Sequence, residues 1–182
     1  MTVEIKIDPS QWVNLEQRVA SAGKNFPLAL RRALAHTGKK AKTKMGRALV
    51  AQTGLKYRTM TKALKTKSTG DMFEIYSKGG NVRASKVRPK QGKGGVIAHP
   101  WNRATEYPGA FTKGGRKHNK PLGKGVLRRT GSGRYPLEQV HTGMYLPTEM
   151  VTGSSASTFY ATAQSELQAR LVHELGFILG KG

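Results

Sequence analysis

Apolar residues spaced three to four positions apart predict two long amphipathic helices in this chain. The first covers residues 26–52 and is stopped by Thr53-Gly54, and the second covers 154–180 and is stopped by Gly180. The inward stripes are Phe26, Leu30, Ala33, Leu34, Ala41, Met45, Ala48 and Leu49 in the first helix, and Phe159, Tyr160, Ala163, Leu167, Leu171, Leu175 and Ile178 in the second.

Polar residues and glycines refine these two helices. Asn25 is the expected N-cap of the first helix, and Ser154 or Ser155 that of the second. Gly38 and Gly46 weaken the first helix, which suggests that they permit close packing or a bend.

The N-terminal region has a shorter pattern. Apolar residues alternate with polar ones over 3–7, which predicts a short strand. Asp8-Pro9 then resembles an N-cap followed by a first-turn proline, so we expect a helix over 9–22 that ends at Gly23.

Between the two long helices the pattern changes to short apolar pieces separated by glycine-rich loops. Residues 57–65 predict a third helix with Met60 and Leu64 inward, and 71–77 predict the first strand of a sheet. Residues 78–95 read as a mobile loop or long hairpin connection, and Leu146-Pro147 as a turn. Further strands are expected at 96–98, 110–111, 126–129 and, as the last, 137–141.

This order of elements predicts an α+β fold, with N-terminal helices, a mainly antiparallel sheet carrying long basic loops, and a C-terminal helix. The length suits a single domain over residues 1–182. Its parts are an N-terminal strand and helix (1–23), basic helices (24–67), the sheet (68–142) and the closing helix (154–180).

The charge is concentrated in the middle of the chain. The net charge is +22. Residues 24–67 hold thirteen Lys or Arg and no acid, and residues 78–134 hold fifteen against Glu106 alone, while both ends are near neutral. A merely soluble basic surface is one interpretation, but acid-free stretches of this length favour contact with a polyanion or an acidic partner.

The densest part lies between Lys113 and Arg134, with eight cations and no carboxylate. Trp101, Tyr107 and Tyr135 lie among these cations and could stack on bases, although packing in the sheet is the favoured interpretation. The candidate contacts to DNA or a partner are Arg31, Arg32, Lys39, Lys40, Lys113, Arg116, Lys117, Arg128, Arg129 and Arg134.

Several other functions find little support in the sequence. The absence of cysteine excludes disulfides, zinc–thiolate sites and thiol catalysis. No run is long enough to span a membrane, and the N-terminus lacks a signal-peptide pattern. The histidines show no metal-ligand spacing. Asp71, Glu74 and Glu106 could form a two-metal nuclease site but match no motif, so we expect neither an enzyme nor a metal or cofactor.

Several local motifs follow one another in a particular order. An alanine-rich basic helix (28–50) and a short basic helix are followed by a basic sheet with Pro108 to Phe111, by Arg128-Arg129, and by Arg134 to Leu137. This order resembles the minor tail protein Z, or tail completion, family of lambda-like long-tailed phages. The resemblance covers roughly residues 25 to 180, and Lys113 to Gly125 does not match the pattern.

The resemblance implies a structural, non-enzymatic protein at the head-proximal end of the tail. Its role would be tail completion, head–tail joining and positioning of the genome end. The implied partners are other tail and neck proteins, with packaged DNA adjacent, and the implied assembly is a homo-oligomeric ring, a hexamer by our expectation. The location would be the virion, and the host cytoplasm during assembly. The alternative is a general, sequence-nonspecific nucleic-acid-binding protein.

Overall fold

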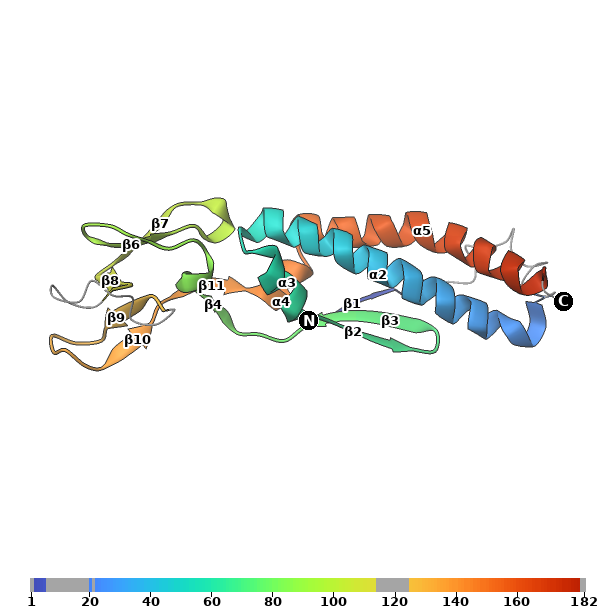
Figure 1. Cartoon of the computed structure of the whole chain (residues 1–182), viewed down its shortest axis with the longest axis horizontal. Helices are drawn as coiled ribbons and strands as arrows, with labels where there is room; N and C mark the ends of the chain where they lie inside the picture. Colours follow the sequence, from blue (N-terminus) through green and yellow to red (C-terminus); the bar gives the residue numbers. More distant parts are fainter. Residues whose placement is uncertain (1, 6–19, 21, 114–124, 181–182) are drawn as a thin grey trace.

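The computed structural model describes residues 2–5, 20, 22–113 and 125–180. It is elongated, with two long helices side by side at one end and several small antiparallel sheets at the other (Figure 1). The long helices are α2 (Phe26–Thr53) and α5 (Gly153–Leu179). The expected α+β class is confirmed.

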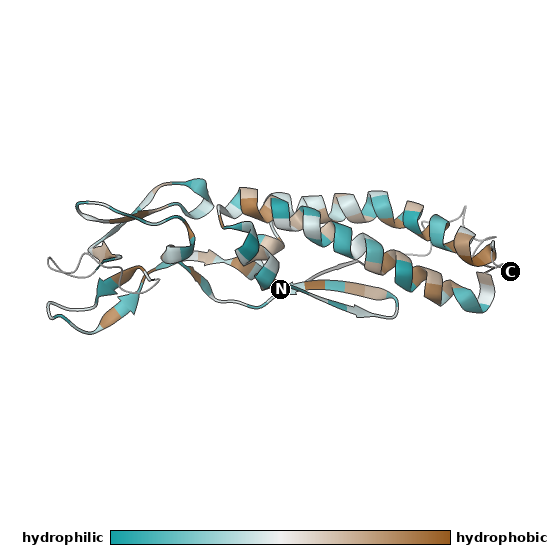
Figure 2. Cartoon of the chain, in the orientation of Figure 1, coloured by the Kyte–Doolittle hydropathy of each residue, from teal (hydrophilic) through white to brown (hydrophobic). Residues whose placement is uncertain are grey.

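Helices α2 and α5 run antiparallel and bury their apolar stripes (Figure 1). Figure 2 shows apolar and polar residues interspersed along both helices, the pattern of helices with one buried side. Much of the buried side of α2 is alanine or glycine, which lets a neighbouring element approach closely. The buried apolar residues are Ala29, Ala33, Leu34, Ala41, Met45 and Leu49 in α2, and Phe159, Ala163, Leu167, Leu171 and Leu175 in α5.

One residue of the stripe predicted for the second long helix, Tyr160, does not face the core. Tyr160 is 57% exposed, whereas Phe159 is fully buried. Adjacent residues on a helix point about 100° apart, so only one of this pair can face α2.

The helix ends agree with the sequence only in part. Gly54 ends α2 in the left-handed conformation at φ 74°, and its N–H donates to the Val50 carbonyl at 2.9 Å. Asn25 precedes α2 but makes no side-chain capping bond. The N-cap of α5 is Thr152 rather than either predicted serine, because α5 already begins at Gly153.

A β-hairpin packs against α2. It consists of β2 (Leu64–Thr69) and β3 (Met72–Ser77), and β1 (Thr2–Ile5) pairs with the other edge of β3. In β3, Phe73, Ile75 and Ser77 are buried, which is the period-two pattern of a strand with one face on the core.

Strand β2 corrects the prediction of a helix over 57–65. Helix α3 ends earlier (Tyr57–Ala63), and Leu64 opens the strand. Leu64 is buried, four residues after the buried Met60, so its spacing looked helical. Every later residue of β2 is exposed, so no apolar alternation marks the strand; its pairing with β3 stabilises it instead.

The predicted single sheet is several small ones. At the end remote from the helices, β5-β6-β7 and β8-β9-β10 form two three-stranded sheets, and β4 pairs with β11 (Figure 1). The elements between the hairpin and α5 are β4 (Asn81–Arg83), β5 (Lys90–Gln91), β6 (Gly95–Ala98), β7 (Thr105–Pro108), β8 (Ala110–Phe111), β9 (Leu127–Arg129), β10 (Leu137–Gln139), β11 (His141–Tyr145) and α4 (Leu146–Met150), with 3-10 turns η3 (Ala84–Lys86) and η4 (Pro100–Asn102).

Three further predictions need correction. The stretch 78–95 contains β4, η3 and β5, because other segments supply their backbone partners. The stretch 137–141 contains the whole of β10 and the first residue of β11, which is the last strand, rather than a single last strand. Leu146-Pro147 begins helix α4, since proline is accepted in a first helical turn. The helix predicted over 9–22 lies almost wholly outside the described residues, and η2 (Gly23–Asn25) follows it.

Gly38 confirms the expectation of close packing. It is buried in α2, and a Cβ built on it would overlap the Phe73 ring of β3. A Cβ on Gly46 of the same helix would lie 3.7 Å from Leu64 and 3.8 Å from Tyr57, which is ordinary contact. The absence of a side chain at Gly38 is therefore what lets the hairpin seat on α2.

We predict opposite effects for alanine at these two glycines. Gly38→Ala should lower the free energy of unfolding by about 1–3 kcal/mol, because overpacking outweighs the better helix propensity. Gly46→Ala is the matched control and should be neutral or stabilising by up to about 1 kcal/mol. Urea unfolding followed by circular dichroism measures both, and equal effects of the two substitutions would contradict the packing argument.

Candidate polyanion-binding surface

The described candidate cations fall into two separate groups. The helix group lies along α2, whereas the sheet group lies on and beside β8, β9 and β10 at the opposite end of the molecule (Figure 1). All of the described candidates are exposed. The helix group is Arg31, Arg32, Lys39 and Lys40, the sheet group is Lys113, Arg128, Arg129 and Arg134, and Arg116 and Lys117 lie outside the described residues.

One member of the helix group is already neutralised. The Nζ of Lys40 lies 2.6 Å from the Oε1 of Glu166 in α5, and that of Lys44 lies 3.9 Å from the same oxygen. The hydrogen bond from Lys40 is the main cause that lowers the pKa of Glu166. Lys40 therefore links the two long helices, and it offers less positive charge to a partner than the sequence suggests.

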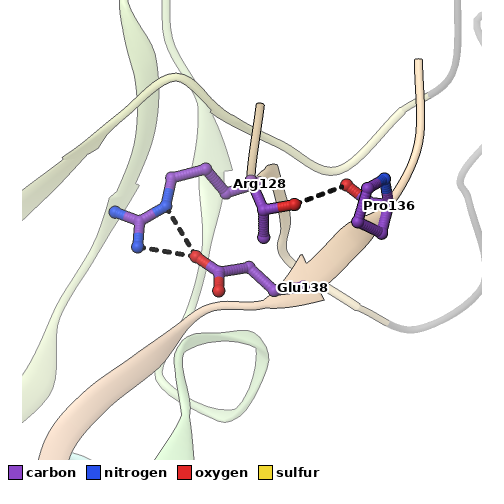
Figure 3. Close-up of polar contacts among 4 residues, drawn as sticks. Arg128, Pro136 and Glu138 are labelled. Carbon is purple, nitrogen blue, oxygen red and sulfur yellow. Dashed lines mark hydrogen bonds and ion pairs between the residues drawn. The ribbon is translucent and has the colours of Figure 1, made fainter. Parts of the chain in front are cut away.

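Arg128 of the sheet group is neutralised in the same way. Its Nε and Nη2 donate to the Oε1 of Glu138 at 3.0 and 2.7 Å (Figure 3). The two residues are directly opposite in the antiparallel pair β9–β10, so the strand register brings them together. Arg128 consequently offers less positive charge to a partner than the sequence suggests.

The other two arginines of the sheet group lie beside aromatic rings instead. The Arg129 guanidinium is 5.9 Å from the centre of the Phe111 ring, and that of Arg134 is 5.8 Å from the centre of the Tyr135 ring. A cation–π contact positions a guanidinium without cancelling its charge. Arg129 and Arg134 thus remain positively charged and exposed.

Tyr135 departs from the favoured expectation that the aromatics pack in the sheet. It is 69% exposed, in the segment that connects β9 to β10. The base of this connection is closed by Thr130, whose N–H and hydroxyl both donate to the Pro136 carbonyl at 3.3 Å. The geometry leaves a tyrosine face and an adjacent arginine open to a ligand.

Trp101 and Tyr107 are used within the fold. The Trp101 indole N–H donates to the Glu149 carboxylate at 2.9 Å, although 38% of the residue is exposed. Tyr107 packs against the core, and burial raises the pKa of its hydroxyl. Tyr107 therefore lacks the free, exposed face that stacking on a base requires, and Trp101 is held to α4 by its bond to Glu149.

The structure also reveals a basic cavity that the sequence analysis overlooked. It has a volume of about 390 Å³ and lies between α2, α3 and β2. Lys39 and Lys42 line it, and their spacing of three residues, which puts both on one side of α2, was the available signal. Burial, and secondly the nearby Lys65 ammonium, lower the pKa of Lys42.

The described residues do not form the metal site that the sequence analysis considers. Among the described residues, no three His, Asp or Glu side chains gather where they could hold a metal ion, so Asp71, Glu74 and Glu106 do not form a joint site. No helix within the described ranges is both long enough and apolar enough to cross a membrane.

No protein-family model matches the chain, and comparisons with curated proteins and with solved structures give no match.

The Lys40–Glu166 ion pair between α2 and α5 predicts that the stability of the fold depends on pH. Since the folded-state pKa of Glu166 is lowered, its ion pair stabilises the fold above the ordinary pKa of 4.5, and this contribution is lost as the pH falls through the lowered value. Glu166→Gln should therefore reduce stability at pH 7 and leave it unchanged at a pH well below the lowered pKa of Glu166.

Urea unfolding at both pH values measures this difference. Glu106→Gln is the matched control, because Glu106 is exposed and has no ion pair within the described part of the chain. A Glu166→Gln variant whose deficit persists unchanged in acid would show that the ion pair is not its cause.

Proposed function

We propose that this protein is a structural, non-enzymatic component of the tail of a lambda-like long-tailed phage, acting at the head-proximal end in tail completion and head–tail joining. The order of motifs through residues 25 to 180 supports this proposal. The strongly basic surface also supports it, because such a surface favours contact with a dense negative neighbour. Packaged DNA and acidic tail subunits are the neighbours that such a position offers.

The observation that carries the proposal is the unequal use of charge. Ion pairs with carboxylates occupy four cations in the described part of the chain: Lys40, Lys44, Arg128 and Arg170. The other described cations have no such pair with a described carboxylate, and the net charge is +22. Repulsion among them is relieved when an external polyanion binds, which favours assembly onto one.

A ring of identical subunits fits this charge distribution best if the basic regions do not meet. Ring closure needs one surface patch to contact a different patch on the next copy. Exposed residues of α5, with few cations, are suited to such a contact, whereas the sheet group would repel itself. We expect a hexamer, with the sheet group turned towards DNA or an acidic subunit.

The alternative function, nonspecific nucleic-acid binding, is favoured by one observation. Tyr135 is exposed beside Arg134, and an aromatic face next to a cation is a common platform for a base of single-stranded DNA or RNA. Under this alternative the isolated protein binds nucleic acid without any tail partner.

We predict that neutralising the sheet group impairs DNA delivery more than assembly. The variant Lys113→Gln/Arg129→Gln/Arg134→Gln should yield tails of normal composition that produce fewer infective particles, because the unpaired cations are removed while the buried core is untouched. The control Arg128→Gln/Glu138→Gln removes an ion pair without changing net charge and should infect normally. Plaque titre and the protein composition of purified particles measure both.

Localisation by image reconstruction of an intact particle tests the proposal itself. The proposal predicts density for this chain at the head-proximal end of the tail. Density elsewhere, or absence from particles, would refute the tail role. Fully infective particles from the triple variant would refute the sheet group as the working surface.

A separate prediction concerns binding of the isolated protein to duplex DNA as a function of salt. If the sheet group binds phosphates, every cation–phosphate pair that the triple variant removes should reduce the slope of log affinity against log salt by roughly 0.9. The Arg128→Gln/Glu138→Gln control should keep the parent slope. Strong binding of this kind without tail partners supports the alternative function, and undetectable binding argues against it.

A further inference from the structure

The cavity between α2, α3 and β2 is a partly open hollow that charged and hydroxyl-bearing residues from three elements line together. Two lysines, a threonine and a glycine come from α2, a tyrosine and a threonine from α3, and a leucine and a threonine from β2. The lining residues are Lys39, Lys42, Thr43, Gly46, Tyr57, Thr61, Leu64 and Thr66.

The charged residues that line this cavity are all positive. None of the lining residues is acidic, although β3 beside it carries Glu74, opposite Lys67 rather than in the lining. The Lys65 ammonium lies close enough to Lys42 to disfavour its protonation, and burial adds to the same effect. Three ammonium groups are thus gathered without a counter-ion from the lining.

The donors in the cavity are also largely unused. The ammonium groups of Lys39 and Lys42 and the hydroxyls of Tyr57 and Thr66 have no hydrogen-bond partner among the residues that the structure describes. Thr43 and Thr61 differ, because their hydroxyls donate to the carbonyls of Lys39 at 3.0 Å and Arg58 at 3.1 Å. Charged and hydroxyl donors that line one cavity from three elements suit a compact anion with several acceptor oxygens.

We infer that this cavity is a binding site for a single phosphate group, held by Lys39 and Lys42 with hydroxyl donors from Tyr57 and Thr66. A phosphate offers several acceptor oxygens and negative charge, which match these donors better than chloride or a lone carboxylate. The group can belong to free phosphate or a nucleoside monophosphate, or to a nucleic-acid backbone. The site does not depend on the proposed tail role.

Gly46 supplies the room for this ligand. A Cβ at this position would have only ordinary contacts with Leu64 and Tyr57, both of which line the cavity. A longer side chain here would extend into the space and fill it. Gly46→Met therefore blocks the cavity without changing a single charge, which separates a defined site from diffuse attraction.

The test uses the full chain, with inorganic phosphate, adenosine monophosphate and a short DNA duplex as separate probes. Isothermal titration measures affinity, and NMR of the lysine side chains follows the protonation of Lys42. Binding should raise the pKa of Lys42, because an anion favours the charged ammonium. Lys42→Gln and Gly46→Met should each weaken binding by about tenfold or more, the usual effect of losing a charged hydrogen bond.

Lys44→Gln is the matched control. Lys44 lies two residues further along α2, faces Glu166 of α5 and does not line the cavity. Its replacement removes the same charge and should leave phosphate affinity unchanged. Circular dichroism establishes that each variant is folded, and if Lys42→Gln unfolds, Gly46→Met and the Lys42 resonance of the parent still decide the outcome.

The probes distinguish the two sources of phosphate. Binding of inorganic phosphate or adenosine monophosphate that Gly46→Met abolishes identifies a site for a free phosphate group. Binding of the duplex alone, with the same dependence on Gly46, identifies a backbone phosphate. The inference is overturned if no probe moves the Lys42 resonance, or if Lys44→Gln weakens binding as much as Lys42→Gln.

Discussion

The shortage of carboxylates is the constraint on which this structure depends. The chain has ten acidic residues against thirty-two Lys and Arg, and several of those acids join separate elements. Glu166 connects α5 to α2, Glu138 connects β10 to β9, and Glu149 connects α4 to α2 and η4. Ten carboxylates can neutralise at most ten of the thirty-two cations, so the surface stays basic although these few acids also hold elements together.

The Glu149 link also couples the helical end of the molecule to its sheets. Its carboxylate accepts from Gln52 of α2 at 2.7 Å and from Trp101 of η4 at 2.9 Å. Asn102 adds a bond from its side-chain amide to the Ala51 carbonyl at 2.7 Å. These contacts lie where α2 ends at Gly54, so they join the long helices to the segment that leads into the sheets.

How far the sequence predicted the fold depended on whether local signals and tertiary contacts agreed. The stripe of α2 and its stop at Gly54 are local features, and both were predicted correctly. Strand β2 was missed because only Leu64 faces the core, and Tyr160 was misplaced because an aromatic beside Phe159 fits the stripe by type but not by angle. The sheets between the hairpin and α5 depend on pairing partners distant in sequence, which no local pattern specifies.

The sequence by itself determined the two long helices, the α+β class and the concentration of cations in the middle of the chain, because helical periodicity and net charge are properties of the residues in order. Only the tertiary structure decided which cations remain free. Strand register placed Glu138 against Arg128, and helix packing placed Glu166 against Lys40. The tertiary structure alone also brought α3 and β2 next to Lys42. Coulombic interactions and desolvation depend on distances that the linear order of residues does not contain.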